Sequence, residues 1–234
     1  MLLNKIPLSL YVHLPWCETQ CPYCDFSITT DPVNGNDEKL AEAIIKDVNQ
    51  SKHLIAGRKF NTIYFGGGTP SLASTESIKH ILDSIKDKFL FNETEITLEM
   101  NPNDVSRDRI DELLMAGINR ISLGIQSYSN QELQALGRNH DRESAIKATQ
   151  ALVGINSTID LIYGIEKQTP KSFTANLERI IQSKINHLSL YQLTIEPNTI
   201  FYKKELKLPS EEEIEKIELI AKDLLDKNGY KQYE

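Results

Sequence analysis

Short runs rich in β-branched residues alternate with longer segments of helical periodicity along most of the 234-residue chain. Six of the short runs are typical of strands: residues 8–13, 62–65, 95–99, 120–124, 158–161 and 187–192. Apolar residues recur at helical spacing in residues 37–56, 74–88, 107–116, 141–152 and 171–183, most clearly at Ile78, Ile81, Leu82, Ile85 and Phe89. This repeated order predicts an α/β fold of parallel strands with right-handed crossovers, either a doubly wound sheet or a barrel.

Unusual residues follow the predicted strands at the point where each strand ends. A cysteine cluster follows the first strand, residues 66–70 follow the second, residues 99–102 the third, and Gln126 with Ser127 the fourth. Because the carboxyl ends of parallel strands in a barrel meet at one rim, polar residues gathered there are typical of barrel enzymes. We therefore favour a partial barrel over a doubly wound sheet.

Residues 210–228 have the pattern of an amphipathic C-terminal helix. Ser210, with Glu213 three residues later, predicts a capping box, and Gly229 predicts the helix end. No predicted strand accompanies this helix, so we assign residues 1–205 to the barrel and 206–234 to the start of a C-terminal region. Because residues 229–234 are entering another ordered element, we expect a fragment or an incompletely ordered part of a longer protein.

The composition indicates a soluble globular protein. Hydrophobic residues make up 40% of the chain, the formal net charge is −7, and the lysines and arginines are scattered along predicted helices. Without a basic patch we expect no binding of nucleic acid. No apolar run reaches the roughly 20 residues of a membrane span, and the N-terminus does not resemble an export signal. We expect a cytoplasmic location, with at most peripheral association with membrane partners.

Three cysteines, Cys17, Cys21 and Cys24, lie within eight residues at the spacing C-x3-C-x2-C. Three thiolates on so short a loop can bind one [4Fe–4S] cubane and leave its fourth iron open to a substrate. A zinc site that adds His13 is an alternative, although this histidine lies in an apolar run where a strand fixes its direction. A disulfide fits less well, because one thiol would be left over and the chain has no signal peptide.

Residues 11–26 (YVHLPWCETQCPYCDF) resemble the cluster loop of the radical S-adenosylmethionine enzymes. Within that superfamily the chain is similar to the branch that contains HemN, the oxygen-independent coproporphyrinogen III oxidase, and HemW, its heme-chaperone relative. The match continues through residues 64–71 (YFGGGTPS), 99–102 (EMNP), 119–127 (NRISLGIQS), 136–139 (LGRN), 160–164 (DLIYG) and 189–197 (SLYQLTIEP). The resemblance implies a partial (β/α)6 barrel with a C-terminal helical extension, a [4Fe–4S] cluster on the three cysteines, and S-adenosylmethionine on the open iron.

The same resemblance assigns cofactor-binding roles to residues in these motifs. Gly67, Gly68 and Thr69 belong to a strip that meets the methionine amino group, and glycines let a backbone approach a ligand closely. Glu99 would accept hydrogen bonds from that ammonium group. The remaining assignments are Gln126, Arg138 and Asp160 at the ribose and the methionine carboxylate, Tyr11 and Tyr23 beside the cluster and cofactor, and Tyr191 and Leu193 on the adenine side.

These residues also have ordinary structural explanations. A triple glycine is typical of a tight strand-to-helix turn, and a glutamate such as Glu99 is often an exposed carboxylate at a strand end. Tyr11 and Tyr23 would then serve in aromatic packing. For Arg138 the chemistry suits the assigned role, since a planar guanidinium can bind both oxygens of a carboxylate.

Phe26 separates two functional interpretations. The decarboxylating oxidases of this branch have a further cysteine two residues after the third ligand, where this chain has Phe26. The resemblance therefore favours a HemW-type heme chaperone, which binds heme and transfers it to acceptor proteins. The heme-related motif of that type lies downstream of a segment like residues 229–234, and we assign no catalytic residue.

Three other functions remain open. One is a coproporphyrinogen III oxidase, in which a 5′-deoxyadenosyl radical abstracts hydrogen from a propionate side chain. Another is radical modification of RNA, which the acidic composition disfavours. A plain zinc-binding scaffold is the last. The sequence does not name the heme acceptor or the oligomeric state, nor decide whether S-adenosylmethionine is cleaved.

Overall fold

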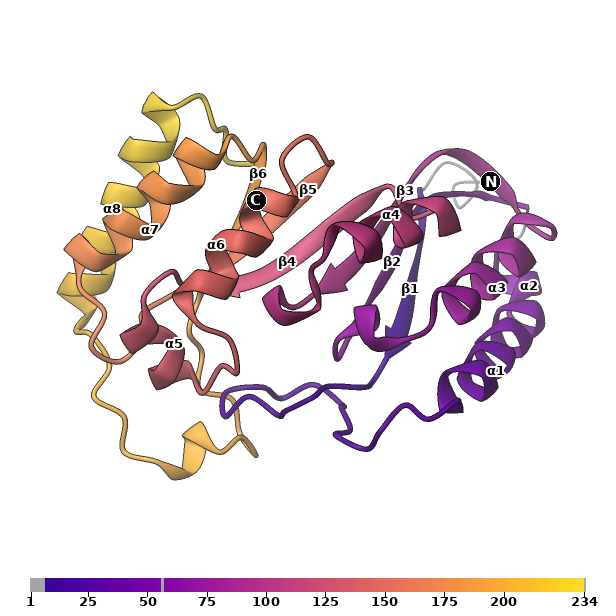
Figure 1. The fold of residues 1–234 in the computed structure, drawn as a ribbon, viewed down its shortest axis with the longest axis horizontal. Coiled ribbons are helices and arrows are strands. Elements are labelled where there is room, and N and C mark those ends of the chain that lie inside the picture. The colour runs from indigo at the N-terminus through magenta and orange to yellow at the C-terminus, as the bar shows by residue number, and fades with distance from the viewer. Residues whose placement is uncertain (1–6, 56, 234) are drawn as a thin grey trace. The chain divides into compact units, whose positions relative to one another are not determined.

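The computed structural model describes residues 7–55 and 57–233, and Figure 1 shows its strands and helices. The strands in the described residues are β1 Leu8–Leu14, β2 Lys59–Gly67, β3 Leu90–Met100, β4 Arg120–Gln126, β5 Ser157–Tyr163 and β6 His187–Gln192. They follow the order β1-β2-β3-β4-β5-β6 in one sheet, with β1 parallel to β2, β2 to β3, and β5 to β6. The six predicted strands and the α/β fold are confirmed.

The helices are α1 Asn36–Gln50, α2 Lys52–Ile55, α3 Thr75–Lys86, α4 Arg107–Ala116, α5 Asn130–Leu136, α6 Arg142–Ala151, α7 Pro170–Ser183 and α8 Glu211–Lys227. The predicted helix over residues 37–56 is divided into α1 and α2, and its last residue, Ala56, lies outside the described residues. Helix α5 does not follow from the sequence pattern, because its seven residues are too short to show a clear period. The predicted C-terminal helix is α8, and its capping box joins Ser210 and Glu213.

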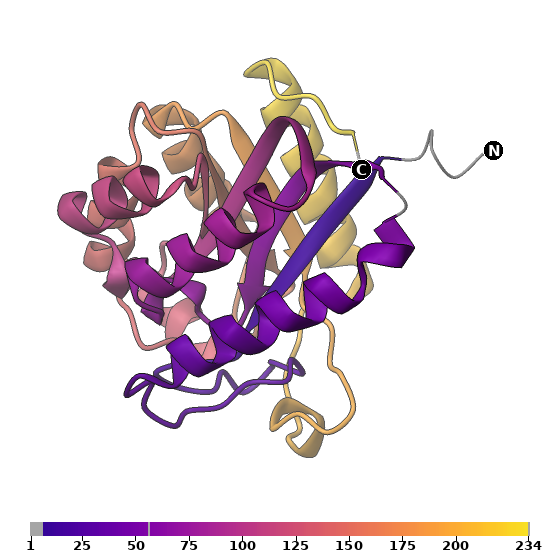
Figure 2. The same ribbon diagram turned by 90° about the vertical axis from the view of Figure 1, so that its right-hand side faces the viewer.

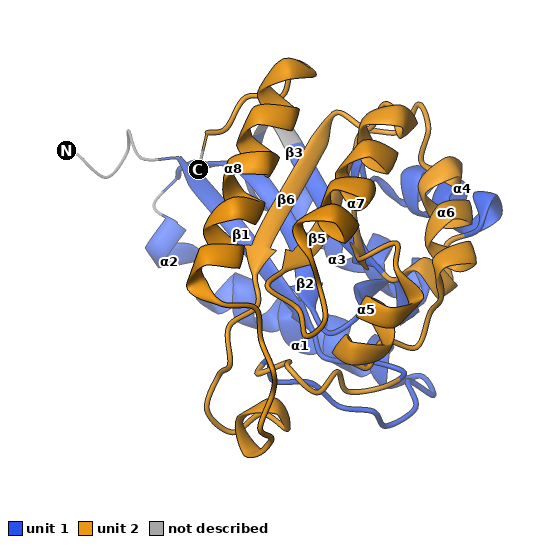
Figure 3. Cartoon of the chain, turned by 90° about the vertical axis from the view of Figure 1, so that its left-hand side faces the viewer, with its two compact units in different colours: residues 1–18, 26–100, 106–121 blue, residues 19–25, 101–105, 122–234 orange. Residues whose placement is uncertain are grey.

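The chain divides into two compact units, which Figure 3 colours separately. Unit 1 comprises residues 1–18, 26–100 and 106–121, and unit 2 comprises residues 19–25, 101–105 and 122–234. The unit boundaries cut the cysteine loop after Glu18 and again after Asp25, so that Cys17 belongs to unit 1 and Cys21 and Cys24 to unit 2.

Unit 1 contains β1, β2 and β3 with helices α1 to α4, and Figure 2 shows the helices beside the strands. The apolar stripe predicted on α3 is fully buried at Ile78, Ile81, Leu82 and Ile85. Ser74 caps this helix by accepting a hydrogen bond from the amide of Ser77. Burial of this stripe fixes the face that α3 turns to the core of unit 1, which also includes the β-strand residues Ile63, Phe65 and Leu98.

Unit 2 contains β5, β6 and most of β4 with helices α5 to α8. Helix α7 begins at a capping box formed by Thr169 and Ser172, and it packs against α8. Leu161 on β5 and Phe173, Leu177 and Ile180 on α7 are completely buried in its core. Within residues 7–55 and 57–233, no helix combines the length and apolarity that crossing a bilayer requires.

Candidate functional site

Cys17 lies just beyond the carboxyl end of β1, against the glycine strip that ends β2. The amide of Gly68 donates to the carbonyl of Leu14 over 2.8 Å, and the amide of Thr69 donates to the carbonyl of Trp16 over 2.6 Å. The hydroxyl of Thr69 is 3.7 Å from the sulfur of Cys17 and donates a weak hydrogen bond to it. Two strand ends thus bring three of the predicted residues, Gly68, Thr69 and Cys17, together within unit 1.

The glycines in this strip are required by close packing of the backbone. Gly67 has φ +113°, and a Cβ atom there would lie 2.6 Å from the ring of His13. A Cβ atom on Gly68 would collide with the carbonyl oxygen of Trp16. The tight turn that the sequence analysis kept as an alternative therefore accounts for these two glycines. A backbone contact with S-adenosylmethionine stays a prediction.

An aromatic pair surrounds Glu99 in unit 1. The Tyr64 hydroxyl donates to Oε1 of Glu99 over 2.8 Å, and the Tyr11 ring stacks on the Tyr64 ring at a centroid distance of 6.2 Å. Partial burial and the nearby Glu99 charge raise the pKa of Tyr11. Glu99 is therefore held by a neighbouring phenol at the end of β3, and the sequence alone gave no signal for Tyr64 in this role.

His13 is anchored in the scaffold of unit 1. Its Nε2 atom lies 2.8 Å from the carbonyl oxygen of Ser27, so this nitrogen carries the proton. The other nitrogen, Nδ1, is 3.4 Å from the hydroxyl of Tyr11 and accepts from it. Because both ring nitrogens of His13 have protein partners, the zinc alternative that used this residue loses its fourth ligand.

Arg138 forms the centre of the predicted site in unit 2. Its Nη2 atom donates to Oδ1 of Asn101 over 2.6 Å and to the carbonyl of Gly124 over 3.1 Å. Its Nη1 atom lies 3.3 Å from the sulfur of Cys21 and 3.5 Å from the hydroxyl of Tyr23. Burial alone would lower the pKa of Arg138, but Tyr23 and Cys21 raise it, so the guanidinium stays charged.

Two buried polar atoms at this position have no hydrogen-bond partner in the described part of the chain. They are Nε of Arg138 and Oε1 of Gln126, the last residue of β4. Gln126 also has φ +64°, a left-handed conformation that is uncommon for a residue with a side chain. A ligand with a hydrogen-bond acceptor for the guanidinium and a donor for the amide would satisfy both atoms. The carboxylate and ribose hydroxyls of S-adenosylmethionine fit this requirement.

The loop that carries Cys21 is clamped within unit 2. A Cβ atom on Gly137, which has φ +69°, would lie 2.5 Å from the Pro22 ring, so only glycine fits beside the loop. On the other side, the amide of Phe201 donates to the Pro22 carbonyl over 3.0 Å, and the Phe201 ring lies 6.2 Å from the Tyr23 ring. Burial raises the pKa of Tyr23, and the neighbouring Arg138 opposes that increase.

The remaining predicted residues of unit 2 have different surroundings. Asp160 on β5 accepts a hydrogen bond of 2.9 Å from the hydroxyl of Ser122 on β4. Leu193 is half-buried and packs against a small cluster that contains Leu136, Ile162 and Ile165. Tyr191 near the end of β6 is 56% exposed. The adenine-side assignments of Tyr191 and Leu193 stay predictions.

The three cysteines are half-buried and form no disulfide. In the described residues, no group of three or more His, Cys, Asp or Glu side chains has an arrangement that could hold a metal ion. The donor set nevertheless suits a cubane, because three thiolates on one short loop are the usual iron–sulfur ligands. Cys17, Cys21 and Cys24 therefore stay the predicted ligands.

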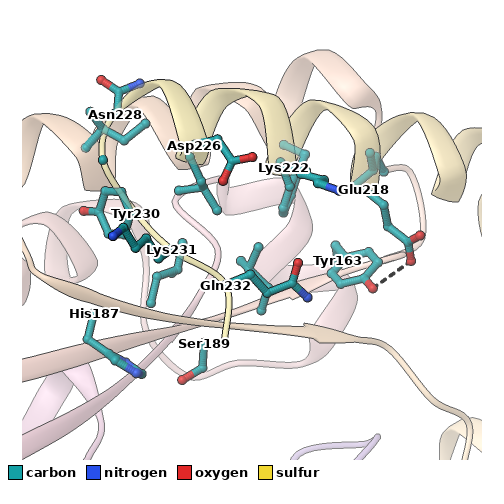
Figure 4. A pocket seen from close by; sticks show the side chains of 18 of the residues that line it. Tyr163, His187, Ser189, Glu218, Lys222, Asp226, Asn228, Tyr230, Lys231 and Gln232 are labelled. Carbon is teal, nitrogen blue, oxygen red and sulfur yellow. Dashed lines mark hydrogen bonds between the residues drawn. The ribbon is translucent and has the colours of Figure 1, made fainter. Parts of the chain in front are cut away.

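A large cavity in unit 2 lies away from most of these residues. Its volume is about 1260 Å³, and it is lined by α7, β6, α8 and residues 228–233 (Figure 4). In this cavity Tyr163 donates to Glu218 over 2.9 Å, and burial together with Glu218 raises the pKa of Tyr163 to about 12. Tyr191 is the only predicted cofactor residue among the lining side chains.

Comparison with known proteins places the chain in a family. Residues 11–180 match the family described as the Radical SAM superfamily. The chain belongs to the Radical SAM superfamily. The match includes the cysteine loop, the glycine strip, Gln126, Arg138 and Asp160, so the predicted cofactor residues from Tyr11 to Asp160 lie within the shared region.

Curated relatives and a solved structure refine this position within the superfamily. The chain is 41% identical to the heme chaperone HemW of Haemophilus influenzae, over 97% of this chain and 62% of that protein. It is 38% identical to the heme chaperone HemW of Escherichia coli, over 97% of this chain and 61% of that protein. The coproporphyrinogen III oxidase HemN of Escherichia coli, a radical SAM enzyme, has a TM-score of 0.84 at 29% identity, covering 96% of this chain and 54% of that chain.

These comparisons confirm the fold prediction of a partial radical SAM barrel, since the open parallel sheet is similar to that of HemN. The chain spans about 61% of the length of the HemW proteins that it matches. Sequence reasoning missed two residues that form hydrogen bonds with predicted ones: Tyr64, which donates to Glu99, and Asn101, which accepts from Arg138. Asn101 stood within a recognised motif, but nothing in that motif indicates its hydrogen bond to Arg138.

Proposed function

We propose that this chain binds a [4Fe–4S] cluster through Cys17, Cys21 and Cys24 and S-adenosylmethionine through Arg138, Gln126 and their predicted neighbours. Three observations support this proposal: the family match, the 3.3 Å approach of Arg138 to the sulfur of Cys21, and the two unpartnered atoms at Arg138 and Gln126. When bound, the cluster and the sulfonium compound supply one-electron chemistry. The residues of this chain then hold and orient the cofactor.

The side chains divide this work by their chemistry. Arg138 offers its unpartnered Nε hydrogen to the methionine carboxylate, while its two Nη groups stay engaged with Asn101, Gly124, Cys21 and Tyr23. Glu99, held by Tyr64, receives the methionine ammonium group. Asp160, held by Ser122, and the amide oxygen of Gln126 accept from the ribose hydroxyls.

We further propose that the protein handles heme as a chaperone of the HemW type. The observation that carries this proposal is the 38–41% identity to proteins named heme chaperone HemW over nearly the whole chain. Phe26, which is 59% exposed, supports it because the decarboxylating relatives have cysteine at this position. Heme is then the cargo, and heme-acceptor proteins are the partners.

The second candidate is coproporphyrinogen III oxidase activity, which the HemN likeness favours. Anaerobic reconstitution followed by chromatography of the porphyrin products separates the two functions. We expect no conversion of coproporphyrinogen III by wild type. We also expect none by Phe26→Cys, because this variant restores the cysteine of the oxidases and no other feature of their sites. Turnover by wild type at a rate comparable to that of a genuine oxidase would promote the second candidate.

Heme titration tests the chaperone directly. We expect weak or no heme binding by the 234-residue chain, since the resemblance places the heme motif downstream of residues 229–234. We expect tight binding by the natural protein where that protein is longer. Equally tight binding by both would place the heme site within the 234 residues, and absence of binding by both would refute the chaperone.

A further inference from the structure

Glu132 on α5 is a buried carboxylate at the centre of a hydrogen-bond network in unit 2. Only 1% of its surface is exposed, and none of the described cations forms an ion pair with it. Four neutral donors surround it instead: Ser127 at 2.6 Å, Ser172 at 2.6 Å, Gln168 at 3.1 Å and Asn176 at 3.0 Å. Burial of a carboxylate is costly, and only such complete satisfaction of its oxygens offsets that cost.

The four donors come from separate parts of unit 2. Ser127 belongs to the turn after β4, Gln168 to the loop after β5, and Ser172 and Asn176 to α7. Gln168 is itself fixed, because its carbonyl oxygen accepts from the amide of Gly164 over 2.8 Å. A single carboxylate thus fastens α5 and the turn after β4 to α7 and the loop after β5.

The network also fixes the turn that contains Gln126. The amide of Ser127 donates to the carbonyl of Ile125 over 2.8 Å, which closes a tight turn around Gln126 with its φ of +64°. The Ser127 hydroxyl, which donates to Glu132, also accepts from the amide of Ser129 over 2.9 Å. Asn176, another partner of Glu132, accepts from the amide of Tyr128 over 2.9 Å. The left-handed conformation of Gln126 is therefore held by residues that Glu132 orients.

Glu132 also precedes Arg138 by six positions in the chain. Helix α5 ends at Leu136, Gly137 turns the chain at φ +69°, and the amide of Arg138 donates to the carbonyl of Leu133 over 2.9 Å. The direction of the guanidinium therefore depends on where α5 sits. Glu132 holds α5 against α7, and in the sequence it lies between Gln126 and Arg138.

The geometry points to Glu132 as a positioning residue that presents Gln126 and Arg138 to S-adenosylmethionine without touching the cofactor. This inference rests on the proposed function, since it deepens the account of the same site. Its physical basis is that a charged acceptor orients several neutral donors at once, and a neutral replacement does not.

Glu132→Gln is the direct test, because glutamine keeps the shape but replaces one acceptor oxygen with a donor. In one orientation the new amide hydrogens face Ser127, Gln168 and Asn176, and in the other they face Ser172; all four donate to Glu132 in the wild type. Either orientation therefore removes at least one of these hydrogen bonds or forces its donor to turn to another acceptor. We expect S-adenosylmethionine affinity, measured by calorimetry on reconstituted protein, to fall roughly tenfold or more. Cluster content should stay unchanged. The matched control is Glu143→Gln on α6, an exposed glutamate that forms an ion pair with Lys147 at 2.8 Å, and this variant should bind S-adenosylmethionine normally.

A second readout needs no cofactor. Hydrogen exchange of the apo protein reports on the amides of Ser127, Tyr128 and Ser129, each of which has the partner named above. We expect faster exchange at these three amides in Glu132→Gln and wild-type exchange in Glu143→Gln. The double variant Glu132→Gln with Asn176→Asp exchanges the two groups, so that the carboxylate is on α7 at position 176 and the amide is on α5 at position 132. It should recover part of the lost affinity and protection.

If Glu132→Gln does not fold, Ser127→Ala replaces it, since this change removes the hydroxyl that joins the carboxylate to the turn of Gln126. The same hydroxyl accepts from the Ser129 amide and from Asn176, so exchange in this variant is read at Tyr128 alone. Unchanged affinity and unchanged exchange in the folded variant would overturn the inference. A lower melting temperature with unchanged affinity would also overturn it, because the role would then be stability alone. If wild type fails to bind S-adenosylmethionine, the proposed function fails, and the exchange of the three amides still decides whether Glu132 holds the turn.

Discussion

Stability should fall between pH 7 and pH 5 because of one buried histidine, His140. Its Nε2 atom lies 3.1 Å from the carbonyl of Ile125, so Nε2 carries the proton of the neutral ring. Its Nδ1 atom is buried without a hydrogen-bond partner in the described residues. Protonation would place an unpaired charge at Nδ1. Burial, with a smaller contribution from the Arg138 charge, lowers the pKa of His140 from 6.5 to about 4.

The sign and size of the effect follow from this pKa. The folded-state pKa lies below the unfolded one, so the unfolded chain binds a proton first as pH falls. Stability from this group is complete above pH 6.5 and is lost as pH falls towards 4. At pH 5 the histidine is largely charged in the unfolded chain and neutral in the folded one. The difference between the two pKa values then lowers the free energy of unfolding by about 2 kcal/mol.

Urea unfolding of the apo protein at pH 7 and pH 5 measures this loss, with His140→Gln as the matched variant. Glutamine can donate to the Ile125 carbonyl but does not titrate. Carboxylates with a lowered pKa, such as Asp37, are common to both proteins, so their contribution cancels in the difference. We expect wild type to lose about 2 kcal/mol more than the variant between the two pH values. Equal losses would refute the reasoning.

The remaining predictions concern the cofactor residues. Replacement of Cys17, Cys21 or Cys24 by serine should abolish the thiolate-to-iron absorption of reconstituted protein, and full iron and sulfide content in all three variants would contradict the cluster assignment. Arg138→Ala should weaken S-adenosylmethionine binding by about 1.5–3 kcal/mol, roughly ten- to hundredfold, with the cluster retained; unchanged calorimetric affinity would remove this residue from the site. Gly68→Ala should cost about 1–3 kcal/mol of unfolding free energy, because its Cβ atom meets the Trp16 carbonyl; an unchanged urea midpoint would contradict the packing seen in unit 1.

The strands and most helices could be predicted from the sequence because their signals are local. The stripe at Ile78, Ile81, Leu82 and Ile85 marks α3 through its period alone, and the structure buries all four side chains. Capping residues identified the start of α8 in the same way. Helix α5 escaped prediction because seven residues give too few turns for a period, and its position depends on contacts made by Glu132 with distant residues.

The site could be predicted only as a set of residue types. Its motifs named Gln126 and Arg138, but the spacing of the motifs does not indicate which polar atoms of these residues have hydrogen-bond partners within the protein. The left-handed conformation of Gln126 depends on the Ser127 and Asn176 contacts, which join residues almost fifty positions apart. The glycine strip shows a second limit of prediction from motifs. Its motif suggested an approach by a ligand, which stays a prediction, but it did not indicate that His13 of β1 lies beside Gly67 and that Pro15 and Trp16 lie beside Gly68.

The unpartnered atoms connect two independent arguments about the cofactor. The resemblance selected Gln126 and Arg138 from their motifs, with no knowledge of hydrogen bonds. Four buried side-chain atoms in the described residues have no partner, and two of them are Oε1 of Gln126 and Nε of Arg138. An unsatisfied buried polar group costs about 1–3 kcal/mol, so folding alone gives no reason to leave two at one site. A ligand that accepts from the guanidinium and donates to the amide would recover that cost. S-adenosylmethionine should therefore raise the unfolding temperature of wild type more than that of Arg138→Ala.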